Sequence, residues 1–250
     1  MAAKKPTKRT PWTCVGVWTL FETGAAVKAA CVGALLVGCG SQALVPDALP
    51  EPGWATYVIA PGRHDAMLLD RSPRNPIDGV TSVIGRDFEL ILDPSAIYEL
   101  TAPVQPNDQL DWNKLPGLSD CNTTDLAVEG LMFGWRWRLD LQPQVLEVTA
   151  YANNAGVHLT PNVPLLALDA ADLDARDPLH YRVWRDTATY HFAVDGEIRG
   201  RVIDAGAMLP RRCSDIERDP LAWAGAFYFG GTSTAPHQIT AQIREAAFVP

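Results

Sequence analysis

Hydrophobic and polar residues alternate along much of the second half of the chain. In one run, Phe133, Trp135 and Trp137 alternate with Arg136 and Arg138. A period of two places the two kinds of residue on opposite faces of a β-strand, one buried and one exposed. The run is therefore predicted to be a half-buried strand.

Short runs of this kind recur between turn residues and predict an all-β chain. Strands are expected at residues 54–60, 88–92, 130–139, 145–151, 179–185, 189–194, 197–203, 223–229 and 237–246. Residues 170–176 alone favour a helix. Asp195-Gly196 predicts a two-residue hairpin turn, because both central positions of a type I′ turn need positive φ. This spacing predicts one antiparallel β-sandwich or jelly roll.

The polar faces of these strands define a candidate site. Alternation places six polar side chains on one sheet face: Arg136, Arg138, Glu147, Thr149, Tyr151 and His191. Such a set would suit a sugar, above all an acidic one. The alternative is a solvated outer face on which the arginines pair with nearby carboxylates.

The first forty residues differ in composition from the rest of the chain. Residues 1–38 carry five basic residues against Glu22, a net charge of +4, and the whole chain has −8, so the remaining residues carry −12. The apolar run at residues 29–38 is too short to span a bilayer and is typical of an export signal. Residues 1–38 are therefore predicted to be a signal peptide.

Leu36-Val37-Gly38-Cys39 resembles the bacterial lipobox, in which lipid is attached to the cysteine after cleavage before it. The resemblance implies that Cys39 is acylated and holds the protein at a membrane of the cell envelope. Gly40 in place of aspartate favours the outer membrane in a cell with two membranes. The alternative is a buried helix that ends in this sequence. Residues 39–75 would form a tether with a first strand, and residues 76–250 the β-domain.

Cys121 and Cys213 remain once the leader cysteines and Cys39 are set aside. Because these two cysteines are left in a chain that is expected to be exported, they are predicted to form a disulfide. The bridge would close a loop of roughly 90 residues, which the chain-entropy model values at about 4 to 5 kcal/mol. Two buried free thiols are the alternative.

Several motifs resemble those of known carbohydrate-active proteins. Residues 111–120, Asp-Trp-Asn-Lys-Leu-Pro-Gly-Leu-Ser-Asp, are similar to the Lys-Leu-Pro-Gly-Leu stretch of jelly-roll polysaccharide lyases of the alginate and glucuronan lyase kind. Later motifs follow in the family's order: Trp135-Arg136-Trp137-Arg138, Thr149-Ala150-Tyr151, Val194-Asp195-Gly196 and Phe229-Gly230-Gly231. The pattern also resembles uncharacterised bacterial lipoproteins with a concanavalin-like sandwich. Both resemblances imply a concanavalin-like jelly roll over roughly residues 85–247.

The resemblance to lyases implies removal of the proton beside a uronate carboxylate. A cation or donor must neutralise that carboxylate while a base and an acid flank the ring. Of the family's reactive positions, Lys114 and Tyr151 are present, whereas its Ser-Thr-Arg triplet is absent. Arg136 or Arg138 would then neutralise the carboxylate. Tyr151 or His191 would be the base.

Three functions are therefore left open. The first is a non-catalytic carbohydrate-binding domain that uses Trp112, Tyr151 and Trp184 on sugar faces, with Glu147 as a polar contact. The second is an active lyase on an acidic polysaccharide. The third is a structural or protein-interaction lipoprotein, which an exposed apolar patch without a groove would favour.

Charge and spacing argue against other partners. The acidic body, in which no basic cluster exceeds Arg211-Arg212, disfavours nucleic acid. The five histidines lack the close pairing of a zinc site, so neither a metal nor a cofactor is expected from them. One acidic loop offers oxygen ligands to calcium, with a solvated turn as the alternative: Asp169, Asp172, Asp174 and Asp177.

Overall fold

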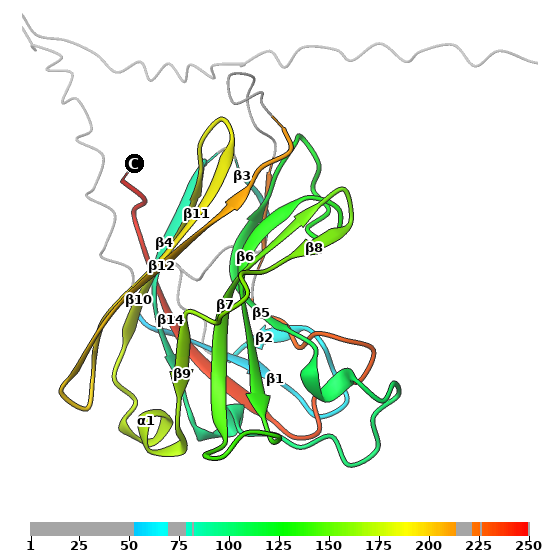
Figure 1. Ribbon diagram of the computed structural model, residues 1–250, viewed down its shortest axis with the longest axis vertical. Helices are drawn as coiled ribbons and strands as arrows, with labels where there is room; N and C mark the ends of the chain where they lie inside the picture. Colours follow the sequence, from blue (N-terminus) through cyan, green and yellow to red (C-terminus); the bar gives the residue numbers. More distant parts are fainter. Residues whose placement is uncertain (1–52, 70–78, 82, 214–221, 226, 250) are drawn as a thin grey trace, which may run out of the picture. The chain divides into compact units, whose positions relative to one another are not determined.

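The computed structural model describes residues 53–69, 79–81, 83–213, 222–225 and 227–249. Their strands form two antiparallel sheets that enclose one hydrophobic core (Figure 1). The expected signal peptide, Cys39 and the first part of the tether lie outside the described residues. No helix within the described ranges is long and apolar enough to cross a membrane.

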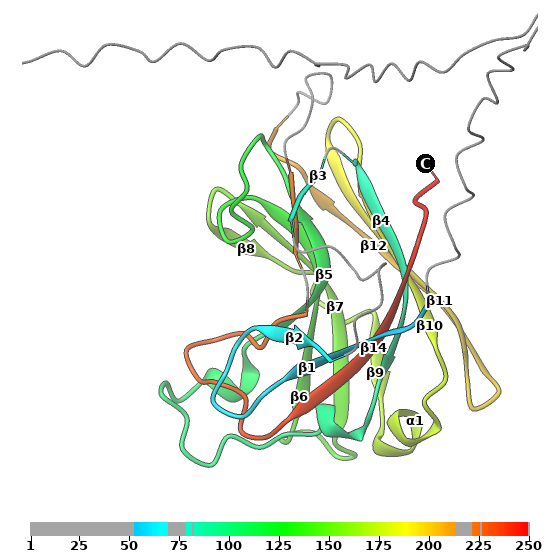
Figure 2. The same cartoon turned by 180° about the vertical axis from the view of Figure 1, so that it is seen from behind.

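The first sheet contains seven strands. Their order across the sheet is β12 (Arg201–Pro210), β11 (Thr189–Ile198), β10 (Leu179–Arg185), β4 (Gly85–Leu92), β14 (Ile239–Ala246), β1 (Ala55–Ile59) and β2 (Ala66–Leu68). Figure 2 shows that β1 and β14 run side by side although they come from opposite ends of the described chain. The strand expected within the tether is therefore part of the sandwich.

The second sheet lies across the core from the first. Its order is β3 (Gly79–Thr81), β13 (Ala222–Gly225), β5 (Asn113–Ser119), β6 (Gly130–Arg138), β7 (Val145–Asn154) and β8 (Val157–Leu159), and β9 (Leu166–Leu168) also pairs with β7. The short helices are η1 (Pro94–Ala96), η2 (Asp108–Leu110) and α1 (Ala170–Ala175). The prediction of an all-β antiparallel sandwich is confirmed, as is the helix expected at residues 170–176.

The alternation predicted for β6 is also confirmed. Phe133, Trp135 and Trp137 are buried in the core, whereas Arg136 and Arg138 are half-buried on the opposite face. We call this opposite face the outer face of the second sheet. It carries the candidate site described below.

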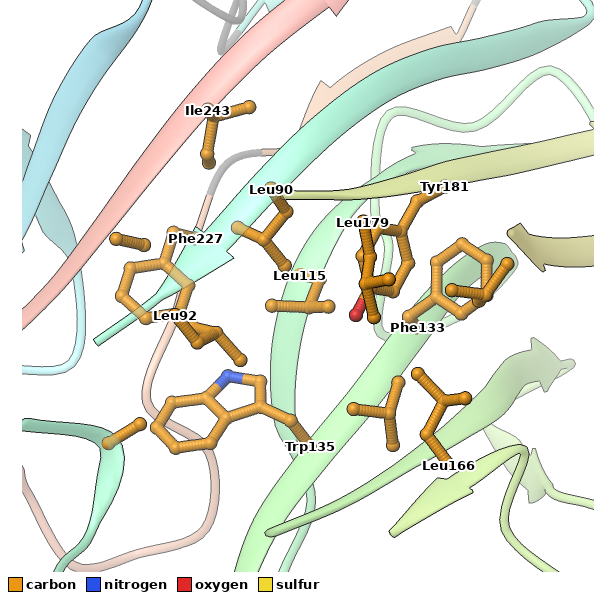
Figure 3. Close-up of a cluster of buried hydrophobic side chains, with 14 of the residues drawn as sticks. Leu90, Leu92, Leu115, Phe133, Trp135, Leu166, Leu179, Tyr181, Phe227 and Ile243 are labelled. Carbon is orange, nitrogen blue, oxygen red and sulfur yellow. The ribbon is translucent and has the colours of Figure 1, made fainter. Parts of the chain in front are cut away.

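Large apolar side chains fill the space between the sheets (Figure 3). Leu90 and Ile243 come from the first sheet, and Phe133 and Trp135 come from the second. The ring of Trp135 stacks on Phe227, with centroids 5.6 Å apart. Burial of one such side chain contributes about 1.5 to 3 kcal/mol, so this core supplies the main stabilisation of the sandwich.

The prediction of a hairpin turn at Asp195-Gly196 is wrong. Strand β11 continues through these residues to Ile198, and the turn lies at Arg199-Gly200, whose φ angles are 48° and 76°. Arg199-Gly200 therefore supplies the two positive φ angles that the tight turn needs. Gly196 lies opposite Ile203 inside the ladder. The later turn lengthens both strands and was missed because Asp-Gly is the stronger short-range signal.

The predicted disulfide between Cys121 and Cys213 is confirmed, with 5.7 Å between the two Cα atoms. The preceding residue, Asp120, is fully buried at the end of β5. Its carboxylate accepts hydrogen bonds from Arg185, from Tyr190 Oη at 2.9 Å and from Arg211 Nη2 at 3.0 Å. Since Arg185 and Tyr190 belong to the first sheet, this carboxylate joins the two sheets.

We expect Asp120→Asn to lower the free energy of unfolding by about 3 to 5 kcal/mol. The substitution removes the negative charge that compensates the buried guanidinium groups of Arg185 and Arg211. Denaturant unfolding of the oxidised protein measures the loss, with Asp174→Asn, at an exposed position of α1, as the matched control. Equal stability of the two variants would contradict this role of Asp120.

Candidate functional site

A groove of about 650 Å³ opens on the outer face of the second sheet. The pairing of β5, β6 and β7 aligns Gly117, Met132 and Tyr151 in one row, and all three residues line the groove. Further polar and aromatic groups line it: Asp65, Asp111, Trp112, Lys114, Asn153, His158 and Tyr228.

An irregularity in β5 determines which of its residues line the groove. The register with β6 shifts between Lys114 and Gly117, and Pro116, which has no N–H to donate, lies in the shifted stretch. Regular alternation would place Leu115 and Leu118 on opposite faces of the sheet. The shift instead allows both leucines to be buried in the core, and Lys114 and Gly117 line the groove together with the edge of Leu115.

The segment after β13 approaches β5 so closely that it requires glycine. Tyr228 and Lys114 exchange backbone hydrogen bonds of 2.8 and 3.0 Å, and the Gly230 N–H donates to Asn113 Oδ1 at 2.7 Å. A Cβ at Gly230 would lie 2.0 Å from the carbonyl oxygen of Trp112. This packing places Trp112, Lys114 and Tyr228 together in the groove.

Lys114 provides the one lysine ammonium of the described residues, because every other lysine of the chain lies within the first 28 positions. Its Nζ donates to the carbonyl oxygen of Trp112 and lies 4.5 Å from the centre of the Tyr151 ring. Burial lowers the pKa of Lys114 to about 8, although the negative charge of Asp111 acts in the opposite direction. The groove therefore holds a cation that is poorly solvated.

Tyr151, Asn153 and His158 form a hydrogen-bonded group. His158 Nδ1 lies 2.8 Å from Tyr151 Oη and 2.5 Å from Asn153 Oδ1. The Asn153 amide donates through Nδ2 to the carbonyl oxygen of Leu126, which turns its Oδ1 acceptor towards the imidazole. Asn153 Oδ1 can only accept, so a proton on His158 Nδ1 satisfies this contact, and in that tautomer Tyr151 Oη accepts from the same N–H. The hydroxyl proton of Tyr151 is left to donate to a ligand.

The pKa of Tyr151 agrees with this donor role. Burial, together with the negative charge of Asp111, raises that pKa to about 12. The side chain is therefore a neutral phenol at neutral pH. Such a group donates a hydrogen bond well but is a weak general acid and is not available as a phenolate base.

Asp111 supplies a carboxylate at the same place. Burial, followed by the charge of Asp108, raises its pKa. Asp108 itself stays ionised, since hydrogen bonds from Ser233, the Gln105 N–H and Thr232 outweigh the effect of burial and lower its pKa to about 2. Asp111 is thus the acceptor that remains for a ligand.

The predicted arginines lie on the expected outer face but are already paired. Arg136 Nε and Nη2 donate to Glu147 Oε2 at 2.9 and 2.8 Å, and its guanidinium lies 3.9 Å from the ring centre of Trp112. Arg138 bridges Glu147 and Asp140. These arginines therefore match the alternative given for this face, in which the arginines pair with nearby carboxylates.

His191 and Trp184 lie elsewhere. They belong to β11 and β10 of the first sheet, where their rings stack with centroids 4.9 Å apart, and His191 Nε2 lies 2.7 Å from Asp186 Oδ2. The expectation that His191 shares one face with Arg136 and Tyr151 is wrong, because alternation assigns the face of a strand but not the sheet to which the strand belongs.

The sequence analysis missed several residues of the groove. Asp111 lies three residues before Lys-Leu-Pro-Gly-Leu, a stretch that was not expected to be a strand, and Tyr228 immediately precedes Phe229-Gly230-Gly231. His158 follows Ala155-Gly156, whose φ angles of 52° and 75° form the tight turn between β7 and β8. That turn was the sequence signal that could have placed His158 opposite β7.

The acidic loop considered for calcium has other partners in the structure. Asp169 and Asp172 form a capping box at the start of α1, and Asp172 also pairs with Arg201 at 2.7 Å. Asp177 Oδ2 accepts from the Arg199 N–H at 2.9 Å. Three of the four carboxylates therefore stabilise the helix and the β11–β12 turn.

No protein-family model and no curated protein matches the sequence. Solved structures match at low identity. An alginate lyase from Chlorella virus is 10% identical over 76% of this chain and 81% of its own, with a TM-score of 0.37. An alginate lyase from Klebsiella pneumoniae is 13% identical over 64% and 57%, with a TM-score of 0.38. The catalytic domain of an endo-1,3-β-glucanase from Thermotoga petrophila is 10% identical over 76% and 75%, with a TM-score of 0.34.

We expect one lysine signal to titrate near pH 8 when the Cε shifts of the ¹³C-lysine-labelled protein are followed by NMR, because burial lowers the pKa of Lys114. An ordinary lysine titrates about two pH units higher. Lys114→Arg should remove that signal and leave the others in place. A spectrum in which every lysine titrates near pH 10 would contradict the burial of Lys114 in the groove.

Proposed function

We propose that this protein binds a carbohydrate chain in the groove of the second sheet, without catalysis. The observation that carries the proposal is that one open groove combines an exposed aromatic ring with polar groups that can still form hydrogen bonds to a ligand. Tyr228 is 37% exposed and lines the groove beside Lys114 and Asp111. An aromatic ring offers an apolar face to a sugar ring, and polar neighbours can bind the hydroxyl groups.

The polar groups meet the needs of sugar hydroxyls, each of which both donates and accepts. The Tyr151 hydroxyl supplies a donor, and the Asp111 carboxylate supplies an acceptor. Tyr151 is held within β7, and Asp111 caps the C-terminal end of η2 just before β5. A site that is fixed in this way loses little conformational entropy on binding.

A second candidate, β-elimination on a uronate polymer, is favoured by one observation. Tyr151 and His158 are hydrogen-bonded beside the Lys114 ammonium, which resembles an acid and base next to a cation. Two features oppose it. The raised pKa of Tyr151 makes the phenol a poor base, and both arginines expected to neutralise a carboxylate are paired with Glu147.

We also propose, from the sequence, that lipid on Cys39 holds the protein in the cell envelope, in the outer membrane where the cell has one. The support is the Leu36-Val37-Gly38-Cys39 motif after a basic and apolar leader. The confirmed Cys121–Cys213 disulfide agrees with an oxidising compartment. A purely structural lipoprotein would not need the groove.

Tyr228→Ala and Tyr151→Phe should each weaken binding of a carbohydrate ligand found on a glycan array by about tenfold, which corresponds to about 1.4 kcal/mol. The first variant removes the stacking face, and the second removes the donated hydroxyl. Calorimetric titration gives the Kd. The matched aromatic control is Trp184→Ala on the first sheet, which should leave the Kd unchanged. Retained affinity in both tyrosine variants would exclude the groove as the binding site.

The same ligands should give no unsaturated product after incubation with the protein. Ultraviolet absorbance follows the double bond that β-elimination would create. If product forms and Tyr151→Phe abolishes it, the second candidate replaces the first.

Cys39→Ser should release the protein from the membrane fraction of the producing bacterium, because the lipid has no other attachment residue in this motif. Fractionation and labelling with radioactive palmitate measure the change. A Cys31→Ser variant, changed within the leader, is the control and should stay membrane-bound. Wild-type protein that takes up no palmitate label would contradict lipid attachment at Cys39.

A further inference from the structure

The cations beside the groove are neutralised by neighbouring carboxylates. Arg136 donates three hydrogen bonds, two to Glu147 Oε2 and one from Nη1 to the Leu110 carbonyl oxygen at 2.8 Å. Arg138 Nη1 donates to Glu147 at 2.9 Å, and its Nε and Nη2 donate to Asp140 at 2.7 and 2.6 Å. Two arginines thus face two carboxylates, and the group carries no net charge.

Trp112 lies between Arg136 and the groove. The Arg136 guanidinium lies 3.9 Å from the ring centre of Trp112, and Trp112, unlike either arginine, is among the residues that line the groove. An acidic ligand in the groove would therefore meet the indole ring rather than a guanidinium. Arg136 packs on the Trp112 ring and holds it in place.

Within the groove, carboxylates outnumber cations. Among its described lining residues, Asp65 and Asp111 are acidic, and Lys114 is the one lysine or arginine. The Lys114 ammonium already donates to the Trp112 carbonyl oxygen and interacts with the charge of Asp111. A polymer with one carboxylate per sugar would meet repulsion from Asp65 and Asp111 without a free cation to offset it.

We infer that the groove takes an electrically neutral glycan and discriminates against polyuronates; this inference rests on the proposed carbohydrate-binding function. A neutral sugar offers adjacent hydroxyl donors, which a carboxylate such as that of Asp111 accepts well. The Tyr151 hydroxyl donates to a sugar oxygen, and Tyr228 covers a ring face. The same Asp111 carboxylate that binds hydroxyls repels a uronate, so one group supplies both affinity and specificity.

Selectivity for a neutral glycan would also exclude β-elimination in this groove. β-Elimination requires a carboxylate next to the proton that is removed, and a neutral glycan has none. A groove selective for neutral chains is therefore not the site of a uronate lyase.

The test titrates the full-length protein in detergent with two sets of probes of equal length: neutral β-linked glucose and xylose oligosaccharides, and oligomers of galacturonate and of mannuronate. We expect at least one neutral set to bind, with a Kd that changes less than about twofold when salt is raised, because no ion pair forms. We expect no saturable binding of the uronates at any salt concentration tested. Uronate binding that weakens with salt, in the absence of neutral binding, overturns the inference but leaves the proposed function standing. Failure of both sets overturns the proposed function itself.

A charge variant tests the cause of the discrimination. Asp111→Asn keeps the shape of the side chain but removes its charge, and should weaken neutral binding about fivefold while allowing detectable uronate binding. Asp65→Asn, at an exposed position, repeats the test if the first variant does not fold. The matched control, Asp174→Asn, should change neither affinity. Uronate exclusion that persists in both groove variants would show that these carboxylates do not cause it.

Discussion

The groove depends on one close backbone contact, that of Gly230 with the carbonyl oxygen of Trp112. No side chain fits at position 230, since its Cβ would lie 2.0 Å from that oxygen. The contact lets Tyr228 pair with Lys114 along the backbone and so places an exposed ring beside a buried ammonium. Gly134 acts similarly on β6, where a Cβ would lie 3.2 Å from the indole of Trp112. Two residues without side chains thus fix the position of the largest ring in the groove.

Buried and half-buried charges of the sandwich are paired with one another. Asp120 joins the sheets through two buried arginines, and Glu147 holds Arg136 against Trp112. Arg86, buried on the first sheet, donates to the Gly117 carbonyl oxygen beneath the groove at 3.0 Å. Such groups are committed to the fold, because an unpaired buried charge costs several kcal/mol. The groups left for a ligand are fewer: the Tyr151 hydroxyl, the Asp111 carboxylate and the Tyr228 ring.

Alternation predicted strands β6 and β7 of the second sheet and their faces correctly, as the burial of Trp135 opposite Arg136 shows. It did not predict which strands share a sheet, because a period of two carries no information on pairing; His191 was misplaced for this reason. Strand β5 was missed, since Pro116 and Gly117 are turn residues in most contexts and only the shifted register accommodates them. The resemblance to lyases predicted Lys114 and Tyr151 as site residues, and both line the groove. Asp111 lies in the same motif as Lys114, and His158 could have been placed opposite β7 by the Ala155-Gly156 turn, whereas Tyr228 comes from a distant segment that no local pattern joins to them.

The central claim is that ligand binds on the outer face of the second sheet, next to Trp112. The most direct measurement is the indole N–H region of the NMR spectrum during titration with the glycan that binds. Trp112 lies in the groove, whereas Trp184 lies on the first sheet and provides an internal reference. We predict a progressive shift of the Trp112 signal that saturates with the calorimetric Kd, with Trp184 unchanged. A shift of Trp184 with Trp112 unchanged would place the ligand on the other sheet and contradict the account.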